Sequence, residues 1–70
     1  MHLRHSIAAR RKELGWTQRM LAERLGWNLR KLESYERNQR IPPLPEAMEI
    51  AEALDTTVNE LWTLEKEKEG

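Results

Sequence analysis

Residues 17–37 read TQRMLAERLGWNLRKLESYER, and this stretch decides the predicted fold. Thr17 can cap a short helix over residues 18–25, because its hydroxyl can accept a hydrogen bond from an otherwise unpaired backbone N–H. Gly26 ends that helix, since glycine readily adopts the left-handed conformation found after helices. A second helix is expected over residues 29–37. Two short helices joined by a three-residue turn that contains glycine form a helix-turn-helix arrangement.

The second of these helices has two unlike faces. On a helical wheel of about 100° per residue, Leu32 and Tyr35 fall together and predict the face turned toward the core. The opposite face is polar and carries Arg30, Ser34 and Arg37. In a helix-turn-helix, a helix of this kind can lie in the major groove of DNA while the first helix crosses the backbone.

The rest of the chain predicts three more helices and no strand. One helix is expected over residues 3–14, and another over residues 44–54 after a proline pair that interrupts helical structure. Thr57, with a glutamate three residues later, has the capping-box pattern and opens a fifth helix. This last helix is expected to carry Val58, Leu61 and Trp62.

Length and composition exclude several classes of protein. Seventy residues, 39% hydrophobic and without cysteine, form one domain that has no room for a deep catalytic cavity and no disulfide or zinc–thiolate site. There is no catalytic, metal-binding or cofactor-binding motif, and no apolar stretch typical of a membrane span or a signal peptide. We therefore expect a cytoplasmic, non-enzymatic domain over residues 1–64, followed by a charged tail over 65–70, with neither metal nor cofactor.

The formal net charge of zero averages two unlike halves. Residues 1–41 hold ten Lys/Arg and four Asp/Glu, which gives a net charge of +6. Residues 42–70 hold two Lys/Arg and eight Asp/Glu, which gives a net charge of −6. This asymmetry indicates either a side that faces a polyanion or two halves that attract each other within the fold.

Several segments together resemble one known family. They are RKELGWTQ (11–18), LAERLG (21–26), YER (35–37), IAEAL (50–54) and NEL (59–61). The combined pattern spans residues 6–62 and resembles the Cro/C1-type helix-turn-helix family, also called XRE or phage repressor-like. The resemblance implies a compact, all-α, five-helix lambda-repressor-like domain. It also implies a prokaryotic or phage-encoded transcriptional regulator, by default a repressor, which binds a palindromic DNA operator as a homodimer.

The resemblance also assigns roles to single residues. It places a partly buried ion pair between Arg11 and Glu36, which ties the first helix to the third. Asp55 departs from the family, because a glycine usually ends the helix there. The residues at DNA-binding positions are Thr17, Gln18, Leu29, Arg30, Lys31, Ser34, Arg37, Gln39 and Arg40.

Some of these DNA-binding roles stay open at the level of sequence. Arg30 suits bidentate reading of guanine but can equally contact a phosphate, and Lys31 suits a phosphate better than a base. Leu29 can touch a thymine methyl group or simply pack in the core. Thr17 is first a helix cap, and Gln39 and Arg40 can belong to a solvated loop.

The last apolar residues raise the question of partners. Val58, Leu61, Trp62 and Leu64 form a strip that serves either the core or a dimer interface. The alternative to a DNA-binding regulator is a protein-interaction module of the same fold, such as an antitoxin-like partner whose acidic half faces a basic protein.

Overall fold

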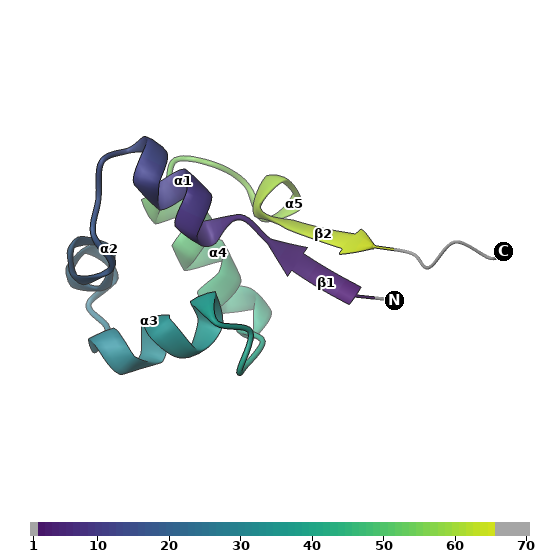
Figure 1. The fold of residues 1–70 in the computed structure, drawn as a ribbon, viewed down its shortest axis with the longest axis horizontal. Coiled ribbons are helices and arrows are strands. Elements are labelled where there is room, and N and C mark those ends of the chain that lie inside the picture. Colours follow the sequence, from purple (N-terminus) through teal and green to yellow (C-terminus); the bar gives the residue numbers. More distant parts are fainter. Residues whose placement is uncertain (1, 66–70) are drawn as a thin grey trace, which may run out of the picture.

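The computed structural model describes residues 2–65, which form five helices and a two-stranded antiparallel sheet (Figure 1). The mostly helical architecture confirms the predicted all-α class, with the small sheet as an addition at one end. In chain order the elements are β1 (His2–His5), α1 (Ile7–Glu13), α2 (Gln18–Leu25), α3 (Leu29–Glu36), α4 (Leu44–Ala53), α5 (Val58–Leu61) and β2 (Trp62–Glu65).

Short polar side chains begin three of the helices. The Thr17 hydroxyl accepts a hydrogen bond from the backbone N–H of Met20 at 3.1 Å, and the side-chain Oδ1 of Asn28 accepts one from the backbone N–H of Lys31 at 2.8 Å. Thr57 caps α5 in the same way, at 3.3 Å from the N–H of Glu60. These caps confirm the predicted starts of the three helices, because each satisfies a donor that the helix itself leaves unpaired.

Residues in the left-handed conformation follow α2, α3 and α4. Gly26 follows α2 with a φ of 72°, so the glycine stop predicted there is confirmed. Asn38 and Asp55 also have positive φ, 61° and 55°, after α3 and α4. Asp55 stands where the family resemblance implies a glycine, and its β-carbon makes this conformation costly.

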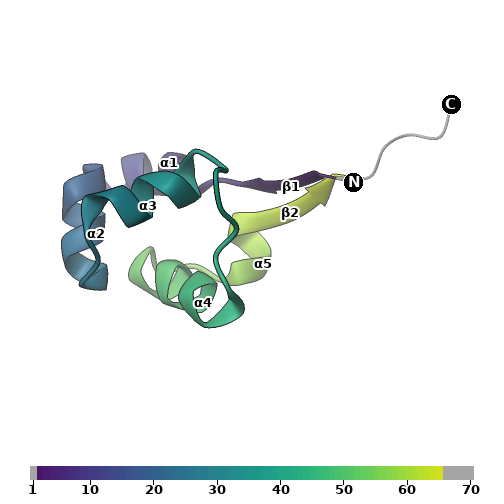
Figure 2. The ribbon, with the colours of Figure 1, turned by 90° about the horizontal axis from the view of Figure 1, so that it is seen from below.

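The core lies between the helices. Ile7 of α1, Leu21 of α2, Leu32 of α3 and Ile50 of α4 are all fully buried. In Figure 2, α3 and α4 lie on opposite sides of this core, with α1 and α2 closing it behind and at the far end. Burying one such side chain stabilises the fold by about 1.5–3 kcal/mol, so α3 is anchored by its inward face.

The sheet corrects the predicted start of the first helix. Residues 3–14 were expected to be helical, but β1 pairs with β2 in antiparallel register, with Leu3 opposite Leu64 and His5 opposite Trp62. The backbone N–H of Ser6 donates to the carbonyl of Leu61 at 2.9 Å and continues this pairing into the helical body. The partners lie about sixty positions apart along the chain, so the helical spacing within residues 3–14 is overridden by long-range pairing.

The end of the chain is corrected as well. The fifth helix is a single turn and stops before Trp62, which is the first residue of β2. Glu65, expected in the tail, is the last residue of that strand, and residues 66–70 lie outside the described part. Among residues 2–65, no helix has the length and apolar character needed to cross a membrane.

Candidate nucleic-acid interface

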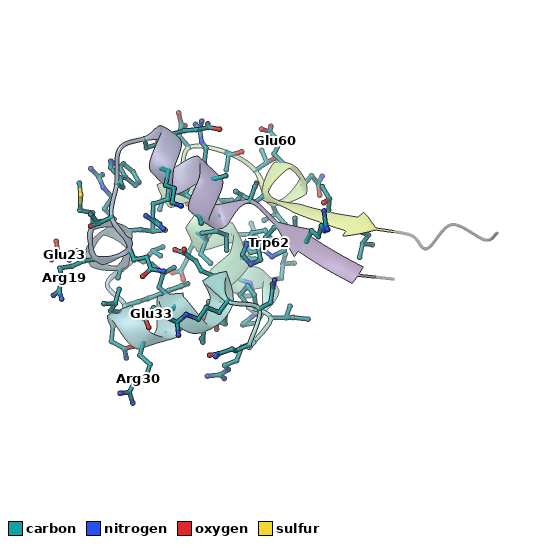
Figure 3. All side chains as sticks on the ribbon, in the orientation of Figure 1. Arg19, Glu23, Arg30, Glu33, Glu60 and Trp62 are labelled. Atoms are coloured by element: carbon teal, nitrogen blue, oxygen red, sulfur yellow. The ribbon has the colours of Figure 1, made fainter. Side chains whose placement is uncertain are left out.

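Helix α3 presents a polar face to solvent because its opposite face is anchored. Leu32 is fully buried and Tyr35 is 4% exposed, so both predicted inward residues lie in the core. On the outer side Arg30 and Arg37 are exposed, and Figure 3 shows Arg30 extending from α3 away from the rest of the molecule. Both cations are therefore open to solvent, and their spacing of seven residues is about two helical turns, which favours the same side of α3.

A buried ion pair ties α1 to α3. The Arg11 guanidinium donates to both carboxylate oxygens of Glu36 at 3.2 Å, and the two side chains are only 10% and 5% exposed. Arg11 also donates to the backbone carbonyl of Trp16 at 2.8 Å. The pair implied by the family resemblance is thus present, and it fixes the end of α3 against the first helix.

Gln18 joins the same network. Its side-chain amide donates to Glu36 Oε1 at 3.2 Å, which connects the first residue of α2 to the last residue of α3. Thr17, the residue before it, is exposed while it caps the helix. The start of α2 and the outer face of α3 are therefore held in fixed relation.

Lys31 has partners that the sequence did not predict. Its ammonium lies 2.7 Å from Glu46 Oε1 of α4 and 4.4 Å from the centre of the Trp27 ring. The same Glu46 oxygen, Oε1, accepts a hydrogen bond from the Tyr35 hydroxyl at 3.0 Å. The contacts with Glu46 span the turn that contains Pro42 and Pro43, so no local sequence pattern could reveal them.

The electrostatics of this cluster follow from its contacts. The hydrogen bond from Lys31 lowers the pKa of Glu46, and the Tyr35 hydroxyl adds to that effect. Burial raises the pKa of Tyr35, and the negative carboxylate beside it raises it further. Arg40, in the loop after α3, also acts on both groups through its charge. At neutral pH the cluster therefore holds a charged Glu46 between two cations and a neutral tyrosine.

The other predicted DNA-binding residues lie along α3 and the loop that follows. Ser34 is half-buried, and its hydroxyl donates to the carbonyl of Lys31 at 2.7 Å. Leu29 is also half-buried and packs against the core, so packing accounts for part of its surface. Gln39 and Arg40 are exposed, and their backbone N–H groups both donate to the carbonyl of Ser34, at 2.9 and 3.3 Å.

Two arginines of α2 were not singled out from the sequence. Arg19, in the first turn of α2, is exposed and points away from the helical body in Figure 3, together with Glu23. Arg24 lies over the Trp16 ring, with its guanidinium 4.0 Å from the ring centre. Both arginines add positive charge to α2, whose first turn contains no acidic residue.

The predicted interface strip is not one surface. Leu61 is 2% exposed, so of the two roles left open for it the structure supports the core. Val58 and Trp62 are half-buried and pack against the core, and Trp62 turns back toward the helices in Figure 3. Leu64 alone of the four is an exposed large apolar residue, at 62%. The strip divides because the helix ends at Leu61 and a strand, with its different side-chain period, continues.

A second apolar surface, which the sequence analysis did not identify, lies on α4 and α5. Leu44 and Met48 of α4 are 64% and 57% exposed, and they line a shallow groove together with Val58 of α5. Acidic side chains, Glu52, Asp55 and Glu60, also line this groove. Its elements belong to the acidic half of the chain, whereas α3 and its loop belong to the basic half.

The comparisons with known proteins concern almost the whole chain. The helix-turn-helix family model matches residues 7–61, from the first residue of α1 to the last of α5. The chain is 28% identical over 72 residues to the cryptic phage CTXphi transcriptional repressor RstR of Vibrio cholerae serotype O1. That match covers 99% of this chain and 64% of the repressor, so the chain spans somewhat less than two thirds of its relative's length.

Proposed function

We propose that this chain, which belongs to the Cro/C1-type helix-turn-helix family, binds double-stranded DNA at specific sequences and regulates transcription. The observation that carries the proposal is the outward face of α3, where Arg30 and Arg37 are exposed while the other side of the helix is fixed in the core. A helix that reads DNA needs this division, because its outer side chains must reach the major groove from a rigid support.

The proposed interface combines base reading with phosphate contacts. Arg30 reads guanine, because its guanidinium matches the O6 and N7 acceptors of that base. Ser34 and Leu29 lie on the same helix and meet neighbouring base edges. Phosphates are held by the remaining members of the set: Thr17, Gln18, Lys31, Arg37, Gln39 and Arg40.

We further propose that two copies bind a palindromic operator. An eight-residue helix such as α3 reads only a few base pairs, so useful specificity requires a second copy on an adjacent half-site about 34 Å away. The groove lined by Leu44, Met48 and Val58 is the surface proposed for contact between the copies, because two of its large apolar side chains, Leu44 and Met48, are exposed and it lies outside the basic part of the chain. Occupation of such an operator would block transcription, in keeping with the repressor named among the relatives.

Selection of bound sequences from a random duplex pool tests the proposal as a whole. We expect an enriched palindrome whose half-sites are centred about one helical turn apart. The logarithm of the affinity should also fall with the logarithm of salt concentration, by about 0.9 for each phosphate neutralised. Absence of any gel shift at low salt, together with a stable complex with another protein on co-purification, would favour the antitoxin-like alternative instead.

Two arginine variants separate base reading from phosphate binding. Arg30→Ala should cost about 1–3 kcal/mol on the selected operator and relax the preference at one base position. Arg37→Ala is the matched control, since it removes another exposed arginine of the same surface and should weaken binding uniformly across sequences. Uniform weakening by the Arg30 variant would reassign that residue to a phosphate.

A further inference from the structure

The cluster around Glu46 contains Lys31, a cation to which the proposed function assigns a contact with DNA phosphate. Lys31 stands next to Arg30 in α3, yet its ammonium lies 2.7 Å from a Glu46 oxygen rather than reaching away from the protein. The Lys31 side chain is still 35% exposed, so solvent and solutes can reach it. The Glu46 carboxylate is more enclosed, at 19% exposed.

Glu46 is itself held firmly in place. The Tyr35 hydroxyl donates to both of its carboxylate oxygens, at 3.0 and 3.3 Å, and the tyrosine is buried in the core. Lys31 is the movable partner, because a lysine ammonium sits on a flexible four-carbon stem and makes no fixed bidentate contact. An approaching phosphate therefore competes with Glu46 for Lys31.

We propose that Glu46 acts as an internal counter-ion that competes with DNA phosphates for Lys31 and so lowers the affinity of the protein for DNA of any sequence. This inference rests on the proposed DNA-binding function. Because phosphate contacts carry no sequence information, a weakened phosphate contact lowers binding to every sequence by about the same factor and leaves the ratio between the correct site and other sites unchanged. Glu46 is thus a positioning residue that sets the overall affinity for DNA without touching it.

The size of the effect follows from the kind of ion pair. A pair that remains partly open to solvent contributes between about 0 and 1 kcal/mol, which corresponds to at most a roughly five-fold change in a binding constant. Glu46→Gln removes the negative charge and leaves an amide oxygen that can still accept the Tyr35 hydroxyl. We expect this variant to bind more tightly, not less, which distinguishes it from a variant that merely disturbs the fold.

The test measures binding of a fluorescently labelled random-sequence duplex by anisotropy at several salt concentrations. Glu46→Gln should bind about two- to five-fold more tightly than the wild type. Its plot of log affinity against log salt should be steeper by about 0.9, the contribution of one additional phosphate contact. Glu49→Gln is the matched control, because it removes the same charge from an exposed position of the same helix and should give a smaller gain and an unchanged slope.

A double-variant cycle identifies Lys31 as the cause. In a Lys31→Gln background, the gain from Glu46→Gln should vanish. A gain that persists there, an equal gain from the Glu49 control, or no gain at all would each overturn the inference. If the wild type binds no duplex even at low salt, the proposed function itself fails, and that result differs from binding without a gain.

A folding check keeps the test decisive. Circular dichroism is recorded first, and if Glu46→Gln does not fold, the single variant Lys31→Gln decides instead. Because Glu46 competes with phosphate for Lys31, this variant should weaken binding to the random duplex less than Arg37→Gln does. A loss as large as that of Arg37→Gln would overturn the inference.

Discussion

Glu36→Gln is the perturbation that most directly probes how the outer face of α3 is held. Glu36 receives three hydrogen bonds, two from the Arg11 guanidinium and one from Gln18, each at 3.2 Å. Glutamine keeps the shape of the side chain but removes its charge. The Arg11 side chain, 10% exposed, then remains buried with the Trp16 carbonyl and the glutamine amide oxygen as acceptors but without an opposite charge.

The expected loss is large for so small a domain. Removing one partner of a buried ion pair costs about 3–5 kcal/mol, because the other charge stays desolvated and unpaired. Taking the lower end, since the Trp16 carbonyl still accepts from Arg11, we expect a loss of about 3 kcal/mol. A domain of this size has a total stability of roughly 4–10 kcal/mol, so the melting temperature should fall by about 12–24 °C.

Urea unfolding followed by circular dichroism measures this loss, and the chain supplies a matched control. Arg10 and Glu13 form an ion pair with the same 3.2 Å separation, but their side chains are 31% and 66% exposed. Glu13→Gln should therefore cost less than about 1 kcal/mol. Equal losses from the two variants, or a loss below 1 kcal/mol from Glu36→Gln, would refute the argument that burial makes the inner pair decisive.

Three further predictions follow from other parts of the structure. Because the pKa of Glu46 is lowered from 4.5, its contribution to stability is present above that pH and is lost as the pH falls below it. The raised pKa of Tyr35 acts in the opposite direction, so its contribution to stability is present below pH 10.0 and is lost as the pH rises beyond it. The free energy of unfolding measured across pH should therefore fall at both the acid and the alkaline end. An acid loss that is unaltered in Glu46→Gln would contradict the assignment to Glu46. Asp55→Gly should raise the free energy of unfolding by about 0.5–1 kcal/mol, because glycine accepts a φ of 55° without strain; a loss in chemical denaturation would argue against strain at this residue. Met48→Glu should dissociate the proposed dimer in sedimentation analysis while changing the stability by less than about 0.5 kcal/mol, and an unchanged sedimentation coefficient would move the interface elsewhere.

The helices were predictable because their signals are local. Thr17, Gly26 and Asn28 act within three or four residues of their own positions, so the limits of α2 and the start of α3 follow from sequence alone. The inward pair of α3 was predictable for the same reason, since side chains three residues apart share a helix face.

The sheet and the Glu46 cluster were not predictable because they depend on distant contacts. Four residues of β1 carry too little alternation to distinguish a strand from a helix start, and their pairing with β2 crosses the whole chain. The ion pair between Lys31 and Glu46 depends on how α4 returns past α3. The prediction of one continuous apolar strip failed for a similar reason. It assumed that the last helix continues through Trp62, where the structure begins a strand.

The pairing of His2 with Glu65 brings the two ends of the described chain to neighbouring strands, about 5 Å apart. In Figure 1 these ends leave the molecule together, on the side far from α2. A short peptide bridge could therefore join them into a circular polypeptide without bending either strand. Such a ring would restrict the unfolded ensemble and leave the arginine-bearing face of α3 untouched.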